Sequence, residues 1–269
     1  MLTVLSAKEG KDVKTAGIIL KLLNGLYSLV LTVILLGVVG FSGYVLWDGN
    51  QIAQSAMTVQ RSVQVYRPTV EDKEEKALSF QDLQKLNPDV CAWLSLSNTN
   101  IDYPVLQGKT NYDYLSMNVY KQYDLTGSIF LDTRNSRFFE DSVQVLYGHS
   151  LGEDNDGIMF SHLKKYEDTS FFENNREGML LSPDGVWKLH IFAFLIAPYE
   201  EDLIFDPEYA AENRSLLLDY VGEHAVRLDT ETLTALRGGT GKILTMTTCT
   251  DEADSDDRRV VLAWMEDAA

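Results

Sequence analysis

An uncharged stretch near the N-terminus constrains this chain more than any other feature. Residues 22–47, LLNGLYSLVLTVILLGVVGFSGYVLW, contain no charged side chain. At about 1.5 Å per helical residue, this stretch exceeds the ~30 Å hydrocarbon core of a bilayer. A cleaved signal peptide is the alternative, but its apolar region usually has only about 7–15 residues. Tyr44 and Trp47 also lie where interfacial aromatic side chains would anchor a helix. We therefore predict one retained transmembrane helix at 22–47.

The charges that flank this stretch predict its orientation. Only Arg61 is basic within residues 48–66 after the stretch. Positively charged flanks stay inside the cell. The basic residues before the stretch are Lys8, Lys11, Lys14 and Lys21. We expect a cell-membrane protein with a cytoplasmic N-terminus at 1–21, an extracellular stalk at 48–76 and an extracellular folded domain at 77–269.

Composition limits the class of partner. The chain of 269 residues has 40 acidic and 23 basic side chains, a net charge of −17. Such a surface repels polyanions, so we expect no nucleic-acid partner. A hydrophobic content of 45% is sufficient for a substantial core.

The folded domain is predicted to be mainly β. From residue 101, short apolar runs rich in β-branched and aromatic residues alternate with turns, which is typical of an antiparallel barrel. A helix is expected after Ser79 as its N-cap, and another where Asp206 caps, Pro207 begins and Gly222 ends a helical stretch. The predicted strands are IDYPVLQ, GSIFLD, VQVLYGH, WKLHIFAFLIA, GKILTMTTC and RRVVLAWM.

Cysteine and histidine are scarce, which narrows the chemistry. The two cysteines are Cys91 and Cys249, and no paired C-x-x-C spacing is present, so we expect no structural metal site. A disulfide between them is the alternative to a reactive thiol. Apolar neighbours make Cys91 a candidate core residue, whereas Cys249 ends a predicted strand.

Among the four histidines, His149 is the candidate catalytic base. It follows VLYG at a strand end, where a side chain can face a cleft. His190 lies inside a predicted strand, and His162 and His224 lie on helical stretches, where surface or capping roles are expected.

Three motifs in order resemble the class B sortases. They are YGHS at 147–150, TMTTC at 245–249 and RRVV at 258–261, and the similarity extends over about residues 78–265. The resemblance implies an eight-stranded sortase-like β-barrel with helical insertions and a cysteine transpeptidase that needs no cofactor. Met246 and Thr247 depart from the usual motif but suit a strand.

The resemblance leaves two candidates for the third catalytic residue. In class B sortases an arginine directly precedes the apolar strand, which favours Arg259, ten residues after Cys249. Strand alternation sends Arg258 and Arg259 to opposite faces, so only one can enter the cleft. We expect Arg259 there and Arg258 facing solvent.

The expected chemistry follows from these residues. A thiol is mostly protonated at neutral pH, so Cys249 needs His149 to raise its reactivity and to protonate the departing amine. Arg259 would stabilise the oxyanion or hold the substrate backbone.

The resemblance also implies the substrates. It implies cleavage of an NPxTx-like sorting signal after its threonine, a thioacyl enzyme, and transfer of the surface protein to a cell-wall amine such as a peptidoglycan precursor. The alternatives are a pilin-polymerising sortase that uses a lysine amine, and a non-catalytic wall-binding β-domain tethered to the membrane.

Residues beside the motifs receive structural interpretations. We expect Tyr147 to pack its ring, Thr248 to pair within a strand and Asp132 to accept hydrogen bonds in a turn. The acidic stretches at 251–257 and 153–157 lack EF-hand spacing and are expected to be solvated loops, not calcium sites.

Overall fold

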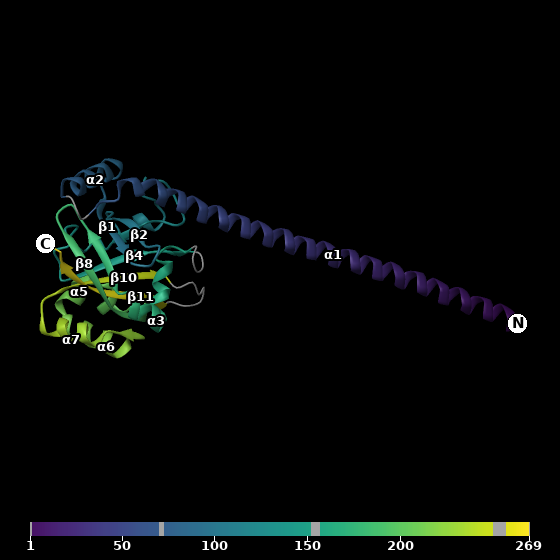
Figure 1. Ribbon diagram of the computed structural model, residues 1–269. Coiled ribbons are helices and arrows are strands. Elements are labelled where there is room, and N and C mark those ends of the chain that lie inside the picture. Colours follow the sequence, from purple (N-terminus) through teal and green to yellow (C-terminus); the bar gives the residue numbers. More distant parts are fainter. Residues whose placement is uncertain (1, 70–72, 152–156, 250–256, 269) are drawn as a thin grey trace. The chain divides into compact units, whose positions relative to one another are not determined.

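The computed structural model describes residues 2–69, 73–151, 157–249 and 257–268 (Figure 1). The chain divides into two compact units, Met1–Gln51 and Ile52–Ala269. The first unit is part of helix α1 (Leu2–Val63). Among the described residues, one helical stretch, Gly17–Tyr66, is long and apolar enough to cross a membrane, judged by length and composition.

The second unit is built on a closed β-barrel. Within the described residues, eight strands follow one another around the barrel, and β11 closes it by pairing with β8. Most pairs are antiparallel, but β10–β4 and β2–β3 are parallel. The strands, in barrel order, are β11 (Asp257–Asp267), β10 (Lys242–Cys249), β4 (Val143–Gly148), β3 (Ile129–Leu131), β2 (Asp102–Leu106), β1 (Val90–Leu96), β7 (Glu177–Leu181) and β8 (Val186–Pro198). The predicted eight-stranded barrel is confirmed.

Strands β1 and β7 were not among the six predicted ones. Six of the seven residues of β1 are buried, so its sequence, VCAWLSL, lacks the alternation of polar and apolar residues that identifies a half-buried strand. Periodicity alone does not distinguish such a short apolar run from a buried helix segment. Strand β7, EGMLL, contains Glu177 and Gly178, which are poor strand formers. The remaining short strands are β5 (Ser150–Leu151), its partner β6 (Ile158–Met159), and β9 (Arg227–Leu228) on the edge of β8.

Helices interrupt the strands, and α4 to α7 contribute to one core cluster on one side of the barrel. Helices α6 and α7 lie side by side in Figure 1 and contact β8. The helices after α1 are α2 (Lys73–Leu86), α3 (Thr169–Asn174), α4 (Asp202–Phe205), α5 (Pro207–Glu212), α6 (Arg214–His224) and α7 (Thr230–Gly238), with 3-10 turns η1 (Gln64–Tyr66), η2 (Asp113–Leu115) and η4 (Ser161–Glu167).

Two helix boundaries differ from the sequence prediction. Helix α2 already includes Lys73, so Ser79 lies inside it and is not its N-cap. Asp206 does cap α5, because its side chain accepts from the backbone N–H groups of Glu208 and Tyr209. The helical stretch then breaks at Asn213, and α6 continues past Gly222 to His224.

Two cores lie on the two sides of the strands that carry the candidate site. On β10, Leu244 and Met246 are buried in the barrel interior, whereas Ile243 belongs to the core beneath the helices. On β11, Val261 faces the interior and Val260 faces the helices. This alternation identifies which face each later residue of these strands occupies.

The segment predicted as a stalk is partly integrated into the second unit. Ala56 and Val63 are buried, and Val63 belongs to the cluster that contains residues of β1 and β2. Gln64 Nε2 donates to Asp102 O at 3.0 Å, and Arg67 Nε lies 3.0 Å from Asp102 Oδ1. The boundary at residues 76–77 stays a prediction, but packing against the barrel begins at Ala56.

Candidate active site

Three adjacent strand ends bring the motif residues together. In the parallel β4–β10 pair, Gly148 lies beside Thr248. His149 and Cys249 are the residues that directly follow this pair. In the antiparallel β10–β11 pair, Arg258 lies opposite Cys249. Strand β10 lies between β4 and β11, and neighbouring strands are about 4.8 Å apart. Cys249 therefore lies at the end of the central strand, with the other two motifs on either side.

A cleft opens at these strand ends. It has a volume of about 300 Å³. The strands contribute its floor, residues 111–115 form a first wall, and residues 199–205 form a second wall. The lining residues are Phe130, Tyr147, Gly148, His149, Thr247, Thr248 and Arg258 on the floor, Asn111, Tyr112 and Leu115 on the first wall, and Tyr199 and Phe205 on the second.

The arginine that lines the cleft is Arg258. Its guanidinium carbon lies 5.9 Å from the centre of the Tyr199 ring, and Nη1 donates to Asp257 O at 3.0 Å. Arg259 instead lies opposite Thr248, and alternation along β11 sends it to the same face as Val261. The geometry thus favours Arg258, the reverse of the sequence expectation. The resemblance favours the arginine that directly precedes the apolar run, Arg259, whereas the register of β10 and β11 favours Arg258.

His149 is oriented by a backbone carbonyl of the first wall. Its Nε2 lies 2.9 Å from Leu115 O. A carbonyl oxygen only accepts, so Nε2 carries the proton and donates. In the neutral ring, Nδ1 is then the nitrogen that can take up a proton.

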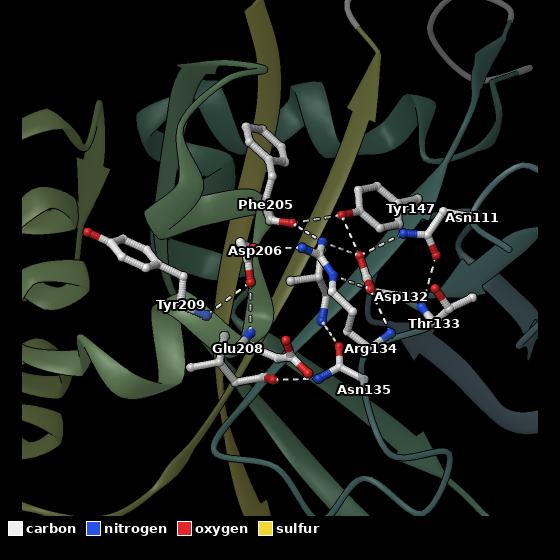
Figure 2. Close-up of polar contacts among 12 residues, drawn as sticks. Asn111, Asp132, Thr133, Arg134, Asn135, Tyr147, Phe205, Asp206, Glu208 and Tyr209 are labelled. Atoms are coloured by element: carbon white, nitrogen blue, oxygen red, sulfur yellow. Dashed lines mark hydrogen bonds and ion pairs between the residues drawn. The ribbon is translucent and has the colours of Figure 1, made fainter.

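A buried carboxylate lies beneath the floor. Asp132 is completely buried, accepts from both Arg134 and Asn111, and is joined by the Tyr147 hydroxyl at 3.0 Å (Figure 2). Burial alone would raise the pKa of Asp132, but the hydrogen bonds and charge of Arg134 outweigh it and hold that pKa below its usual value. The sequence suggested a turn acceptor and ring packing here. It missed the network because Asn111, Tyr147 and Phe205, which complete it, come from parts of the chain that are distant from Asp132 and Arg134 in sequence.

Cys91 is a core residue, as expected. It is a free, buried thiol that donates to Val105 O at 3.5 Å, and burial raises its pKa to about 12. The disulfide alternative is therefore not what the structure shows. A thiol with such a pKa is unreactive at neutral pH, which leaves Cys249 as the candidate nucleophile.

The other histidines lie away from the cleft lining. His190, on β8, lies 2.9 Å from Glu266. His224 stacks on Tyr220 at 4.1 Å. His162 was expected to have a surface or capping role but is buried, and its Nδ1 accepts from Asn100 N at 2.9 Å. Helical position alone does not reveal that η4 packs against the barrel.

The acidic stretches at 251–257 and 153–157 were predicted to be solvated loops and not calcium sites. Residues 250–256 and 152–156 lie outside the described part of the chain. Among the residues that are described, no group of three or more histidine, cysteine, aspartate or glutamate side chains could hold a metal ion.

Comparison with known proteins agrees with this geometry. No protein-family model matches the chain. Sortase B of Listeria monocytogenes is 31% identical over 237 residues, which are 86% of this chain and 93% of the relative. Sortase B of Staphylococcus aureus is 30% identical over 183 residues, 68% of this chain and 72% of the relative.

Solved structures agree in fold as well. A Staphylococcus aureus sortase B–substrate complex superposes with a TM-score of 0.66 at 28% identity, covering 82% of this chain and 98% of that one. A Streptococcus pyogenes class B sortase involved in pilus biogenesis has a TM-score of 0.60 at 29% identity, covering 71% and 100%. With its closed barrel, its ordered motifs and these relatives, the chain belongs to the class B sortases, which are cysteine transpeptidases.

Proposed function

We propose that this transpeptidase cleaves an NPxTx-like C-terminal sorting signal after its threonine and transfers the surface protein to a cell-wall amine. The observation that supports the proposal is the register of β4, β10 and β11, which pairs Arg258 with Cys249 and Gly148 with Thr248 at strand ends whose residues His149, Thr248 and Arg258 line an open cleft. The cleft has aromatic residues on both walls, which suits an extended peptide. The substrate complex of the Staphylococcus aureus relative supports a peptide substrate.

In the first half-reaction, the Cys249 thiolate attacks the threonine carbonyl carbon. The carbonyl π electrons move to oxygen, and Arg258 donates hydrogen bonds to the resulting oxyanion. Protonated His149 then gives its proton to the departing amine as the C–N bond breaks. The products are a thioester on Cys249 and the released C-terminal peptide.

In the second half-reaction, an amine of the acceptor attacks the thioester. His149, now neutral, takes a proton from the amine, and the C–S bond breaks to regenerate the thiolate. The surface protein leaves with a new amide bond. Arg259 remains the competing assignment for the oxyanion-stabilising residue.

The proposed location matches the substrates. With residues 22–47 in the membrane and residues 1–21 inside, the barrel lies outside the cell. Sorting-signal proteins and a lipid-linked peptidoglycan precursor both arrive at the outer face of the membrane. An anchor at this face raises the local concentration of both substrates.

The proposal is tested with the full chain in detergent micelles and a fluorogenic NPxTx-like peptide. Cleavage should be lost in Cys249→Ala and kept in the matched Cys91→Ala, because the latter thiol is buried in the core. Cleavage retained in Cys249→Ala would overturn the assignment. If no peptide in a sorting-motif library is cleaved by the unmodified chain, the wall-binding β-domain is favoured.

A pilin-polymerising activity is the second candidate, favoured by the likeness to the Streptococcus pyogenes pilus sortase. The two activities differ in the amine. Competition between a pilin-type lysine peptide and a cell-wall cross-bridge peptide as acceptor separates them. High-molecular-weight covalent ladders of a surface protein that depend on this chain would favour polymerisation.

A further inference from the structure

The two walls of the cleft are tied to each other beneath its floor. Asn111, on the first wall, donates from Nδ2 to Asp132 Oδ2 at 2.9 Å and accepts from Thr133 N at 2.9 Å. The second wall ends at Phe205, whose carbonyl oxygen accepts from Arg134 Nη2 at 2.8 Å. One carboxylate and one guanidinium therefore join Asn111 and Phe205, which are 94 residues apart in sequence.

Arg134 uses its planar fork almost completely. Nε and Nη2 bind the two oxygens of Asp132 at 2.9 and 2.8 Å. The second hydrogen of Nη2 binds Phe205 O, and Nη1 lies 2.7 Å from Asp206 Oδ2. Four of the five N–H groups thus have partners, two on the barrel and two at the junction of α4 and α5 (Figure 2).

The Tyr147 hydroxyl also lies between Asp132 and the junction of α4 and α5, but it cannot bind both at once. The Tyr147 hydroxyl lies 3.0 Å from Asp132 Oδ2 and 3.1 Å from Phe205 O, but it has one proton and donates to one of them at a time. Asp206 uses Oδ1 to cap α5 and Oδ2 to bind Arg134. The guanidinium therefore links the helix cap to the buried carboxylate.

Arg134 is not itself a cleft residue. The cleft lining does not include Arg134. It includes Asn111, Tyr147 and Phe205, each of which contacts Asp132 or Arg134. We propose that Arg134 is a positioning residue that sets the separation of the two cleft walls and thereby the affinity for the sorting peptide. The inference deepens the proposed function and rests on it for the identity of the ligand.

Arginine and lysine are not equivalent in this role. A lysine ammonium keeps the charge, but it cannot bind both oxygens of Asp132 in one plane while it reaches Phe205 O and Asp206. Arg134→Lys should therefore retain part of the effect, and Arg134→Gln should lose it.

The chain offers a matched control. Arg176 Nη1 binds Asp229 Oδ2, and Asp229 caps α7 as Asp206 caps α5. Arg176→Gln therefore breaks an arginine–cap pair of the same kind away from the cleft lining.

The experiment compares Arg134→Gln, Arg134→Lys and Arg176→Gln in the full chain in detergent. We expect Arg134→Gln to raise KM for the sorting peptide about tenfold with kcat changed less than about threefold, because bound substrate re-forms the wall. In the Cys249→Ala background, its Kd for a labelled peptide should rise by the same factor. Arg134→Lys should lie between, and Arg176→Gln should match the unmodified chain.

A readout without peptide separates the two proposals. Amide hydrogen exchange at Ile204, Phe205 and Asp206 should be about tenfold faster in Arg134→Gln than in Arg176→Gln. Equal exchange in the two variants would overturn the positioning role, whether or not any peptide is cleaved. An equal rise of KM in both variants would also overturn it. Faster exchange without cleavage by the unmodified chain would instead remove the proposed substrate.

Discussion

Replacing each of the two adjacent arginines, Arg258 and Arg259, in a separate variant tests the geometry of the site most directly. Arg258 lines the cleft and lies opposite Cys249, whereas Arg259 lies opposite Thr248 and outside the cleft lining. We expect Arg258→Gln to lower kcat/KM far more than Arg259→Gln, because Arg258 lies opposite Cys249 and lines the cleft in which an oxyanion would form.

The structure sets the size of the effect. Loss of one oxyanion donor costs about 2.7–4 kcal/mol in other acyl-transfer enzymes. Arg258 is only half-buried and its cleft is open to water, which places the cost toward the lower end. About 3 kcal/mol corresponds to a loss of roughly 150-fold in kcat/KM. Arg259→Gln should lose less than about tenfold, equivalent to ~1.4 kcal/mol.

The assay is cleavage of the fluorogenic sorting peptide by the full chain, with thermal unfolding recorded for each variant. Arg258→Lys serves as the charge-conserving control and should recover part of the rate, since an ammonium still stabilises negative charge. A larger loss in Arg259→Gln than in Arg258→Gln, at unchanged melting temperature, would refute the reasoning from register and restore Arg259 as the catalytic arginine.

Three further predictions follow from burial and charge. A thiol-alkylating reagent at neutral pH should label one site per native chain, and none in Cys249→Ala, because burial raises the pKa of Cys91 to about 12; labelling of Cys91 in the native chain would contradict this. Asp132→Asn should cost about 3 kcal/mol, at the lower end for a broken buried pair since Arg134 is 36% exposed, and so lower Tm by roughly 6–12 °C. The folded-state pKa of Asp132 is lowered, so its contribution to the free energy of unfolding is complete above the unfolded pKa of about 3.9 and is lost as pH falls through the folded value. Asp132→Asn should therefore flatten the acid limb of the curve of stability against pH. An unchanged acid limb would count against the ion pair. Met246→Ala should cost about 2–5 kcal/mol of unfolding free energy in denaturant titration, because Met246 is fully buried in the barrel interior, and a cost below ~1 kcal/mol would show that the site collapses without a cavity.

Much of the fold could be read from local patterns. Six strands appear as β-branched and aromatic runs between turns, and α5 begins at Asp206 and Pro207 as capping rules predict. These features depend on residues close in sequence. The strands β1 and β7 were missed because packing within the barrel, not local preference, decides them.

In the candidate site, too, some residues could be predicted from the sequence and others could not. His149 and Cys249 could be chosen from the sequence because each residue type is scarce and each ends an apolar run. The buried Asp132–Arg134 pair could not be recognised, since its meaning depends on Asn111 and Phe205, which only the folded barrel brings near.

By itself, the sequence determined the class of fold, the order of the motifs and the two candidates for nucleophile and base, because hydrophobic periodicity and residue chemistry are local properties. Only the tertiary structure decided which arginine meets the cleft. The face that a strand residue occupies depends on the core against which the strand packs and on the register with its partner strand, and neither can be read from the linear sequence. Val260 and Val261, which divide between the two cores, supply the count that distinguishes Arg258 from Arg259.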